Sequence, residues 1–285
     1  MTNARAVGGV ADTALWTAAA RARESRRADR LFSDPFAEVL AGPTGVALLQ
    51  HFHTEHAADD GNPFLPIRTR WFDDTVVAAV AAPGGPRQVV GIGAGLDSRA
   101  FRLAWPAGTV LFELDQPALL DYKADRLAPL APEPRCERRV VPANLGGGWT
   151  GALRDAGFDP ARPTLWFAEG VLFYLPEALA AEVVRAMAAL SAPGSRLAAD
   201  LVGLGVFRLP YTRPFLRKLA DAGSPWQFGT DDPAGFVRAN GWADVTVLEP
   251  GRPDADFGRW PAGANPVNLP GLPRSFLVSA VRGTP

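Results

Sequence analysis

The sequence predicts an α/β protein with a doubly wound, seven-stranded sheet that ends in an antiparallel hairpin. From Pro83 onward, short apolar runs alternate regularly with helical stretches. One of these runs, residues 89–92, leads into closely spaced glycines, as expected of a strand, a turn and a helix. The last two runs, residues 244–248 and 275–281, are joined by a long connection, which fits two antiparallel strands that close the sheet.

The first 82 residues contain no strand–helix–strand unit, and we expect them to form a helical cap over the mouth of the sheet. Proline suits the first position of a helix, and the Gly42-Pro43 pair interrupts one. The expected helical segments are residues 13–27, a short helix from Pro35, residues 44–52 and residues 62–82. The chain therefore divides into a cap, residues 1–82, and a sheet domain, residues 83–285.

The sheet domain follows from its apolar runs and from the prolines that open its helices. The expected strands are residues 89–92, 110–112, 139–142, 163–168, 195–201, 244–248 and 275–281. The expected helices are residues 96–103, a helix from Pro117, and residues 151–156, 176–190, 212–222 and 233–240.

The glycine turn after the first strand, with Gly91, Gly93 and Gly95, is the first candidate binding element. Glycine accepts positive φ and lets a ligand lie against the backbone, and a following helix offers free N–H groups. Ser98 stands where the dinucleotide fingerprint has its third glycine, so that fingerprint is not met. A strand–helix turn that binds nothing would also carry such glycines.

Two acids strengthen the prediction of a binding site. Glu113 and Asp115 end the second strand, about twenty residues after the glycines, where a carboxylate reaches ribose hydroxyls. We therefore expect a cofactor with a ribose at the carboxyl ends of the first two strands.

Composition narrows the class of protein. The chain has 285 residues, of which 47% are hydrophobic, enough for a large core. Its net charge of −1 gives no basic field for nucleic acid or an anionic membrane. Cys136 is the only cysteine, so no internal disulfide is expected, and its arginine neighbours suggest at most a reactive thiol. We expect a cytoplasmic protein without an export signal or a membrane span.

All three histidines fall in one short segment, at His51, His53 and His56. The spacing completes no known metal motif, so no metal site is expected. A solvated surface cluster is the favoured interpretation, and the alternative is that one histidine faces a substrate.

Four segments together resemble the leucine carboxyl methyltransferase-like family, which includes bacterial small-molecule and polyketide O-methyltransferases. They are VVGIGAGLDSRAFRL, FELDQP, FAEGVLFYL and ALWTAAARARES with the following LFSDPFA. The resemblance covers nearly the whole chain. It implies a class I methyltransferase fold, which is Rossmann-like, with S-adenosylmethionine at the carboxyl edge of the first two strands.

The resemblance also implies roles for cofactor-binding residues. The glycine turn would pack against the methionyl part and the ribose, and Asp115, with Glu113 next in line, would bind the ribose hydroxyls. Arg70 matches the arginine that pairs with the cofactor carboxylate, for which a guanidinium fork is well suited, and Arg21 is a second candidate. Glu169 would lie near the amine or the sulfonium.

Two further positions follow from the same resemblance. Many relatives have Asp-Leu after the third strand, whereas this chain has Asn144-Leu145, whose amide can still pair with an adenine edge. Tyr174 would lie on the substrate side.

The expected reaction is methyl transfer to an oxygen of a small acceptor, in polyketide-type metabolism, which requires alignment and exclusion of water. A carboxylate acceptor would be held by an arginine and needs no base. A phenol or an enol needs one, and His53 or an acid of the cap is the candidate. The alternatives are a nicotinamide-dependent oxidoreductase, disfavoured by Ser98 and the terminal hairpin, and a catalytically silent binding protein of the same fold. We expect a monomer or homodimer without nucleic-acid or membrane partners.

Overall fold

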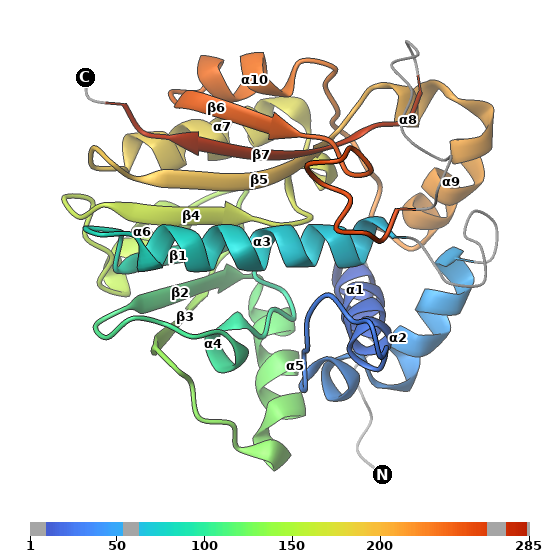
Figure 1. Ribbon diagram of the computed structural model, residues 1–285, viewed down its shortest axis with the longest axis horizontal. Helices are drawn as coiled ribbons and strands as arrows, with labels where there is room; N and C mark the ends of the chain where they lie inside the picture. Colours follow the sequence, from blue (N-terminus) through green and yellow to red (C-terminus); the bar gives the residue numbers. More distant parts are fainter. Residues whose placement is uncertain (1–9, 54–62, 261–271, 284–285) are drawn as a thin grey trace.

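A seven-stranded sheet in the order β3-β2-β1-β4-β5-β7-β6 forms the centre of the molecule (Figure 1). The computed structural model describes residues 10–53, 63–260 and 272–283. The strands are β1 (Gln88–Ile92), β2 (Val110–Asp115), β3 (Glu137–Pro142), β4 (Thr164–Ala168), β5 (Arg196–Val202), β6 (Ala243–Leu248) and β7 (Ser275–Val281). Only β7 runs antiparallel to its neighbours, β5 and β6. The predicted α/β fold with antiparallel terminal strands is confirmed.

Helices surround this sheet. They are α1 (Val10–Ser25), α2 (Ala37–His53), α3 (Phe64–Ala81), α4 (Arg99–Arg102), α5 (Pro117–Leu127), α6 (Trp149–Asp155), α7 (Glu177–Ala189), α8 (Gly205–Arg208), α9 (Arg213–Asp221) and α10 (Pro233–Ala239). Single 3₁₀ turns lie at η1 (Ala128–Leu130), η2 (Leu172–Tyr174) and η3 (Pro210–Thr212). Gly42 breaks α2 with φ 57° and ψ −176°, as the Gly-Pro pair predicts.

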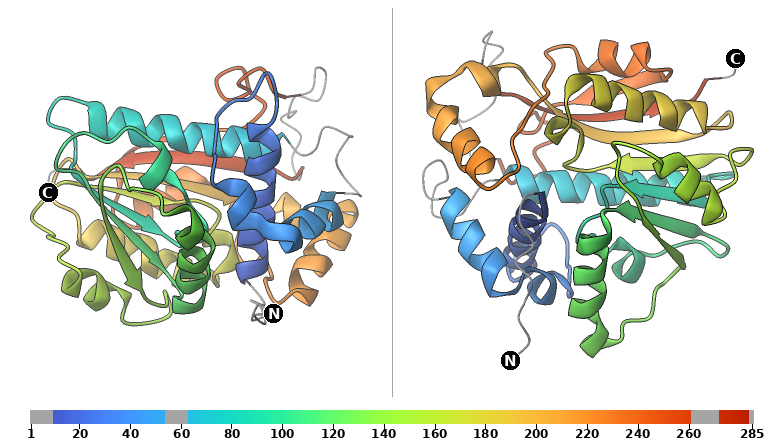
Figure 2. Two further views of the ribbon diagram at one scale, coloured as in Figure 1. Left: turned by 90° about the horizontal axis from the view of Figure 1, so that it is seen from below. Right: turned by 180° about the vertical axis from the view of Figure 1, so that it is seen from behind.

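Two hydrophobic clusters cover the two faces of the sheet. Alternate residues of a strand point to opposite faces, so Val89 joins one cluster while Val90 and Ile92 join the other. The first cluster includes residues of α1, α2, α3 and α5, and the second includes residues of α6 and α7. Figure 2 shows α3 on one side of the sheet and α6 and α7 on the other. Strands β1 and β4 are buried along their whole length, as the apolar runs predict.

The carboxyl edge of the sheet is where the expected site lies. Strand β1 pairs in parallel with β2 on one side and with β4 on the other, so the chain order reverses at β1. Such a reversal leaves a crevice at the carboxyl ends of the strands. Helices α1, α2 and α9 gather at this edge (Figure 1).

The helix expected directly after the glycine turn is shorter than predicted. It spans four residues, Arg99–Arg102, instead of residues 96–103. The Asp97 carboxylate accepts a hydrogen bond from the Arg99 backbone N–H and holds the chain in a turn first. The start of this helix, Ser98 and Arg99, lines the cavity described below, so the expectation that a helix N-terminus meets the ligand at this point stays a prediction.

Helices of the cap pack directly against the sheet. Helix α3 runs along one face of the sheet (Figure 1), and residues of α1 and α3 belong to the same cluster as Val89 and Leu111. The division at residue 82 stays a prediction. Among the described helices, none combines the length and the hydropathy needed to cross a lipid bilayer.

Candidate active site

A cavity of about 490 Å³ opens at the carboxyl edge of the sheet. Its wall comes from α1, the start of α3, the ends of β1 to β4, and the segments around α8 and α9. This volume falls in the range of small-molecule sites, which is about 300–1,000 Å³. The cavity contains both the glycine turn and the acids that the sequence singles out.

Gly93 and Gly95 line the cavity and require glycine for conformational reasons. Their φ angles are +62° and +48°, in the left-handed region. A Cβ on Gly93 would lie 2.4 Å from Val171 Cγ2, so the turn could not carry a side chain there. Gly91 does not line the cavity: it lies within β1, and a Cβ there would meet the Phe167 ring at 2.6 Å.

Asp115 lies at the end of β2 and lines the cavity beside the glycine turn. Its Oδ2 accepts a hydrogen bond from the Gly95 N–H over 2.6 Å, and its Oδ1 accepts one from the Gln116 N–H. Burial raises the pKa of this carboxyl group. The structure thus brings together the glycines and the acid twenty residues later, as predicted.

Glu113 does not face the cavity, in contrast to the prediction. Its Oε2 accepts from the Lys123 ammonium over 2.6 Å and from the Arg138 guanidinium over 2.7 Å. Glu113 and Lys123 are both fully buried. This acid therefore forms a buried ion pair between β2, α5 and β3, and it does not reach a ribose.

Arg70 is also placed elsewhere than predicted. Its guanidinium bonds to Asp74 and to the Leu31 carbonyl oxygen, its side chain is 40% exposed, and it does not line the cavity. Arg68, two residues earlier on α3, is the arginine of this segment that lines the cavity. It is buried at 6% exposure and donates to Glu169 and Asp200 over 3.1 Å each.

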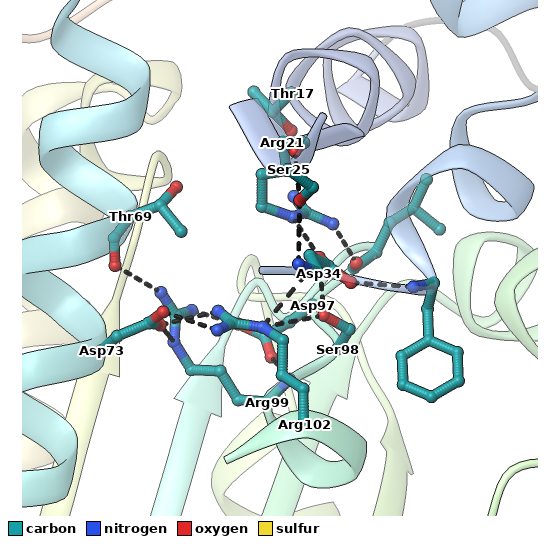
Figure 3. A network of polar contacts seen from close by, with 12 residues as sticks. Thr17, Arg21, Ser25, Asp34, Thr69, Asp73, Asp97, Ser98, Arg99 and Arg102 are labelled. Carbon is teal, nitrogen blue, oxygen red and sulfur yellow. Dashed lines mark hydrogen bonds and ion pairs between the residues drawn. The ribbon is translucent and has the colours of Figure 1, made fainter. Parts of the chain in front are cut away.

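Arg21 lies where the sequence predicts it, in the cavity wall on α1. It donates to Asp34 over 2.9 Å and to the Leu96 carbonyl oxygen over 2.6 Å, which ties the cap to the glycine turn. Ser98 also donates to Asp34, over 2.7 Å, so one carboxylate joins both segments. Figure 3 shows Arg21 and Ser98 at the Asp34 carboxylate, with Arg99 and Arg102 below them.

The arginines of the segment LDSRAFR were not predicted as site residues, although both line the cavity. Arg99 pairs with Asp73, Asp97 and Glu169, and Arg102 donates two hydrogen bonds to Asp73 (Figure 3). The signal that could have found them is their spacing, since residues three apart share one side of a helical turn.

Charged neighbours set the protonation of the two acids in this network. Burial alone would raise the pKa of Asp97, but Arg99, Lys123 and Arg102 lower it to about 2. For Glu169, burial is likewise outweighed by Arg99 and Arg68, which hold its pKa below the usual value. Glu169 lines the cavity as predicted, and both acids are ionised at neutral pH.

Acids and arginines occur together in this inner part of the site. The cavity is lined by Asp97, Asp115 and Glu169 and by Arg21, Arg68, Arg99 and Arg102. Asp34, Asp73 and Asp200 pair with these arginines from behind the wall. The inner cavity therefore offers both signs of charge to a ligand that itself carries both.

Asn144 and Leu145 follow β3 and line the cavity on the far side of Asp115. The Asn144 side-chain oxygen accepts from the Gly146 N–H over 2.9 Å, which leaves its NH₂ group to donate. Tyr174 lines the cavity from η2, and burial raises the pKa of its phenol, so it is a neutral hydroxyl at pH 7.

The described part of the histidine segment agrees with the favoured interpretation, a surface cluster. His51 is exposed, packs its ring on Phe52, and does not line the cavity. His53 is the last residue of α2, and its side chain, like His56, lies outside the described residues. The role of His53 stays a prediction.

The described residues also bear on the other chemistry considered from the sequence. They contain no group of three or more histidine, cysteine or acidic side chains that could hold a metal ion. Burial raises the pKa of the Cys136 thiol to about 12, so the expectation of a reactive thiol is wrong.

The leucine carboxyl methyltransferase family model matches residues 14–188. The chain belongs to the leucine carboxyl methyltransferase family. It is 44% identical over 248 residues to a putative S-adenosyl-L-methionine-dependent methyltransferase of Parafrankia sp., covering 84% of this chain and 78% of that protein. A protein of Mycolicibacterium smegmatis with the same description is 44% identical over 200 residues, 67% of this chain and 66% of its own length. The match thus spans just under two thirds of that relative.

Solved structures agree on the fold of this family member. A methyltransferase of Thermobifida fusca, described as putative, superposes with a TM-score of 0.56 at 19% identity. The alignment covers 92% of this chain and 96% of that one. The class I methyltransferase fold predicted from the sequence is confirmed.

Proposed function

We propose that this chain transfers a methyl group from S-adenosylmethionine to an oxygen of a small-molecule acceptor, in polyketide-type secondary metabolism. The observation that carries the proposal is the Asp115 carboxylate, bonded to the Gly95 N–H at the wall of the cavity. The cofactor predicted from the sequence is confirmed by the names of the relatives. Oxygen as the acceptor atom rests on the resemblance described above.

The inner cavity fits this cofactor chemically. S-adenosylmethionine carries a sulfonium, an amine and a carboxylate, and the acids and arginines of the inner wall can pair with both signs of charge. Asp115 would accept hydrogen bonds from ribose hydroxyls, and Glu169 would attract the amine or the sulfonium. Arg68 and Arg21 would meet the carboxylate. The NH₂ group of Asn144 would donate to an adenine nitrogen.

The residues of the cavity wall would position the cofactor and the acceptor and supply charge beside them. When bound, the cofactor supplies an electrophilic methyl carbon on a positively charged sulfur. Asp115, Glu169 and the arginines of the wall would hold this group so that its methyl carbon faces the acceptor. A hydroxyl acceptor also loses a proton, which His53 or an acid of the cap would accept. Helix α1 and the segments around α8 and α9 cover the cavity and exclude water.

A nicotinamide dinucleotide fits this site less well. It carries a pyrophosphate, and the Asp97 and Asp115 carboxylates beside the glycine turn oppose an anion there. The helix after the turn has only four residues and begins three residues beyond Leu96.

Calorimetry on the full chain tests the proposal. We expect micromolar binding of S-adenosylmethionine and of S-adenosylhomocysteine, and no binding of NAD. Binding of none of them would contradict a methyltransferase function. Tight binding without a methylated product from any of a set of phenols, enols and carboxylic acids would favour the silent binding protein.

A further inference from the structure

The outer part of the cavity, beyond the glycine turn, is walled by aromatic rings from separate segments. Trp16 comes from α1, Phe215 from α9, and Trp226 from the loop after α9. The ring centroids of Trp16 and Phe215 lie 6.0 Å apart, and those of Phe215 and Trp226 lie 5.3 Å apart. The Tyr174 ring stands perpendicular to Trp226 at 6.2 Å. These four rings, the aromatic wall, present flat apolar faces and ring edges to a ligand.

The aromatic wall is built from α1, η2, α9 and the loop after α9, and not from the glycine turn or the end of β2. Strand β7 is three strands from β1, which at about 4.8 Å per strand places it roughly 14 Å away. Glu249 and Arg274, which flank the ends of β6 and β7, line the cavity on that remote side. The acceptor and the cofactor would therefore occupy different parts of one cavity.

Among the described residues, the guanidinium that lines the cavity on that remote side, Arg274, is already paired with a carboxylate. Arg274 donates through Nε and Nη2 to the two oxygens of Glu249, over 2.8 and 2.7 Å. Hydrogen bonding to Arg274 holds the pKa of Glu249 below its usual value, so the pair stays charged and closed at neutral pH. The remaining described guanidiniums of the wall, on Arg21, Arg68, Arg99 and Arg102, pair with inner carboxylates. A carboxylate acceptor would have to compete with these partners, and at Arg68 and Arg21 also with the carboxylate of the cofactor.

We propose that the acceptor is an uncharged aromatic alcohol, a phenol, whose ring packs among Trp16, Phe215 and Trp226 with its hydroxyl toward Tyr174. This inference rests on the proposed methyl transfer and names the substrate class of the same site. It separates the chain from carboxylate methylation, the activity that the family name describes. In the transfer, the phenol oxygen gains the methyl carbon, the carbon–sulfur bond breaks with its electrons on sulfur, and the phenolic proton passes to the base expected from the sequence, His53 or an acid of the cap.

Three probes of similar size test the inference by calorimetry on the full chain saturated with S-adenosylhomocysteine. They are 2-naphthol, 2-naphthoate and the saturated alcohol 2-decalol, which differ in charge and in aromaticity. We expect 2-naphthol to bind roughly tenfold or more tightly than either of the others, since ring contacts and desolvation of a charge each act at this scale. Equal or tighter binding of 2-naphthoate, equal binding of 2-decalol, or no binding of 2-naphthol would overturn the inference.

Variants locate the binding. Phe215→Leu and Trp226→Leu should each weaken 2-naphthol binding by about 3- to 10-fold, with the affinity for S-adenosylhomocysteine retained as proof of folding. Glu249→Gln frees the Arg274 guanidinium and should raise the affinity for 2-naphthoate several-fold. If none of the three substitutions changes these affinities, the ligand binds elsewhere, and the aromatic wall is not the acceptor site. Failure of S-adenosylhomocysteine to bind in the first titration would instead reject the proposed function itself.

Discussion

The Gly95 backbone N–H donates to the Asp115 carboxylate over 2.6 Å, which joins the turn after β1 to the end of β2. Gly95 has φ +48°, so the same residue supplies the bend and the donor. The contact holds a buried carboxylate in the wall of the cavity, and this gives the first prediction.

Asp115→Ala should weaken the binding of S-adenosylmethionine by about 1–3 kcal/mol, the value of hydrogen bonds to a charged group. Calorimetry measures this directly. Asp121→Ala, an exposed acid on α5, is the matched control and should leave the affinity unchanged. Equal affinities for the wild type and for Asp115→Ala would remove Asp115 from the site.

Arg68 and Arg70 form the second comparison. Arg68→Lys keeps one charge but loses the guanidinium that contacts Glu169 and Asp200, and we expect about tenfold weaker cofactor binding. Arg70→Ala removes a half-exposed pair with Asp74 and should change the free energy of unfolding by less than about 1 kcal/mol, with the cofactor affinity unchanged. Calorimetry and urea unfolding give both quantities. The reverse pattern would restore Arg70 as the ligand.

The glycine turn gives a third prediction. Gly93→Ala forces a side chain onto positive φ and against Val171, so the free energy of unfolding should fall by about 1–3 kcal/mol or more. Gly147→Ala is the control, because a Cβ there has no atom within 4 Å. Urea unfolding of the two variants should differ by that amount. A wild-type stability for Gly93→Ala would show that the turn rearranges freely.

The ionisation of Asp97 makes the free energy of unfolding depend on pH. Its pKa is lowered to about 2, so the ionised form stabilises the fold above its ordinary pKa, and this stability is lost as the pH falls through about 2. Asp97→Asn should therefore be less stable than the wild type by about 2 kcal/mol at pH 7, and the difference should shrink between about pH 4 and pH 2. Urea unfolding across this range tests the trend. A difference that stays constant with pH would mean that Asp97 gains no stability from its charge.

Much of the fold follows from the sequence because the signals are local. Apolar runs give β1 and β4, and the long connection before β7 gives the antiparallel edge. Asp115 was found because a residue that ends a parallel strand lies at the carboxyl edge, whatever the rest of the chain does. Glu169 was found through the family resemblance of its segment.

The wrong predictions of site residues concern positions where only tertiary contacts decide which side chain faces the cavity. In the RTR segment, residues two apart on a helix point about 200° apart, and only packing against Glu169 and Asp200 selects Arg68 over Arg70. Glu113 and Asp115 share a strand face, and only the distant Lys123 diverts one of them from the cavity. The aromatic wall escaped prediction because Trp16, Phe215 and Trp226 are neighbours only in space.

The buried contact between Glu113 and Lys123 has a consequence for natural variation. Loss of Glu113 leaves the Lys123 ammonium unpaired in the interior, at a cost of about 3–5 kcal/mol, and loss of Lys123 leaves Glu113 with Arg138 alone, while the wall of the cavity stays intact. Such a variant would show normal turnover per folded molecule and a reduced amount of protein in the cell, because quality control removes the unfolded fraction. Joint replacement of Glu113 and Lys123 by apolar residues would avoid the loss, so the two positions should change together over evolutionary time.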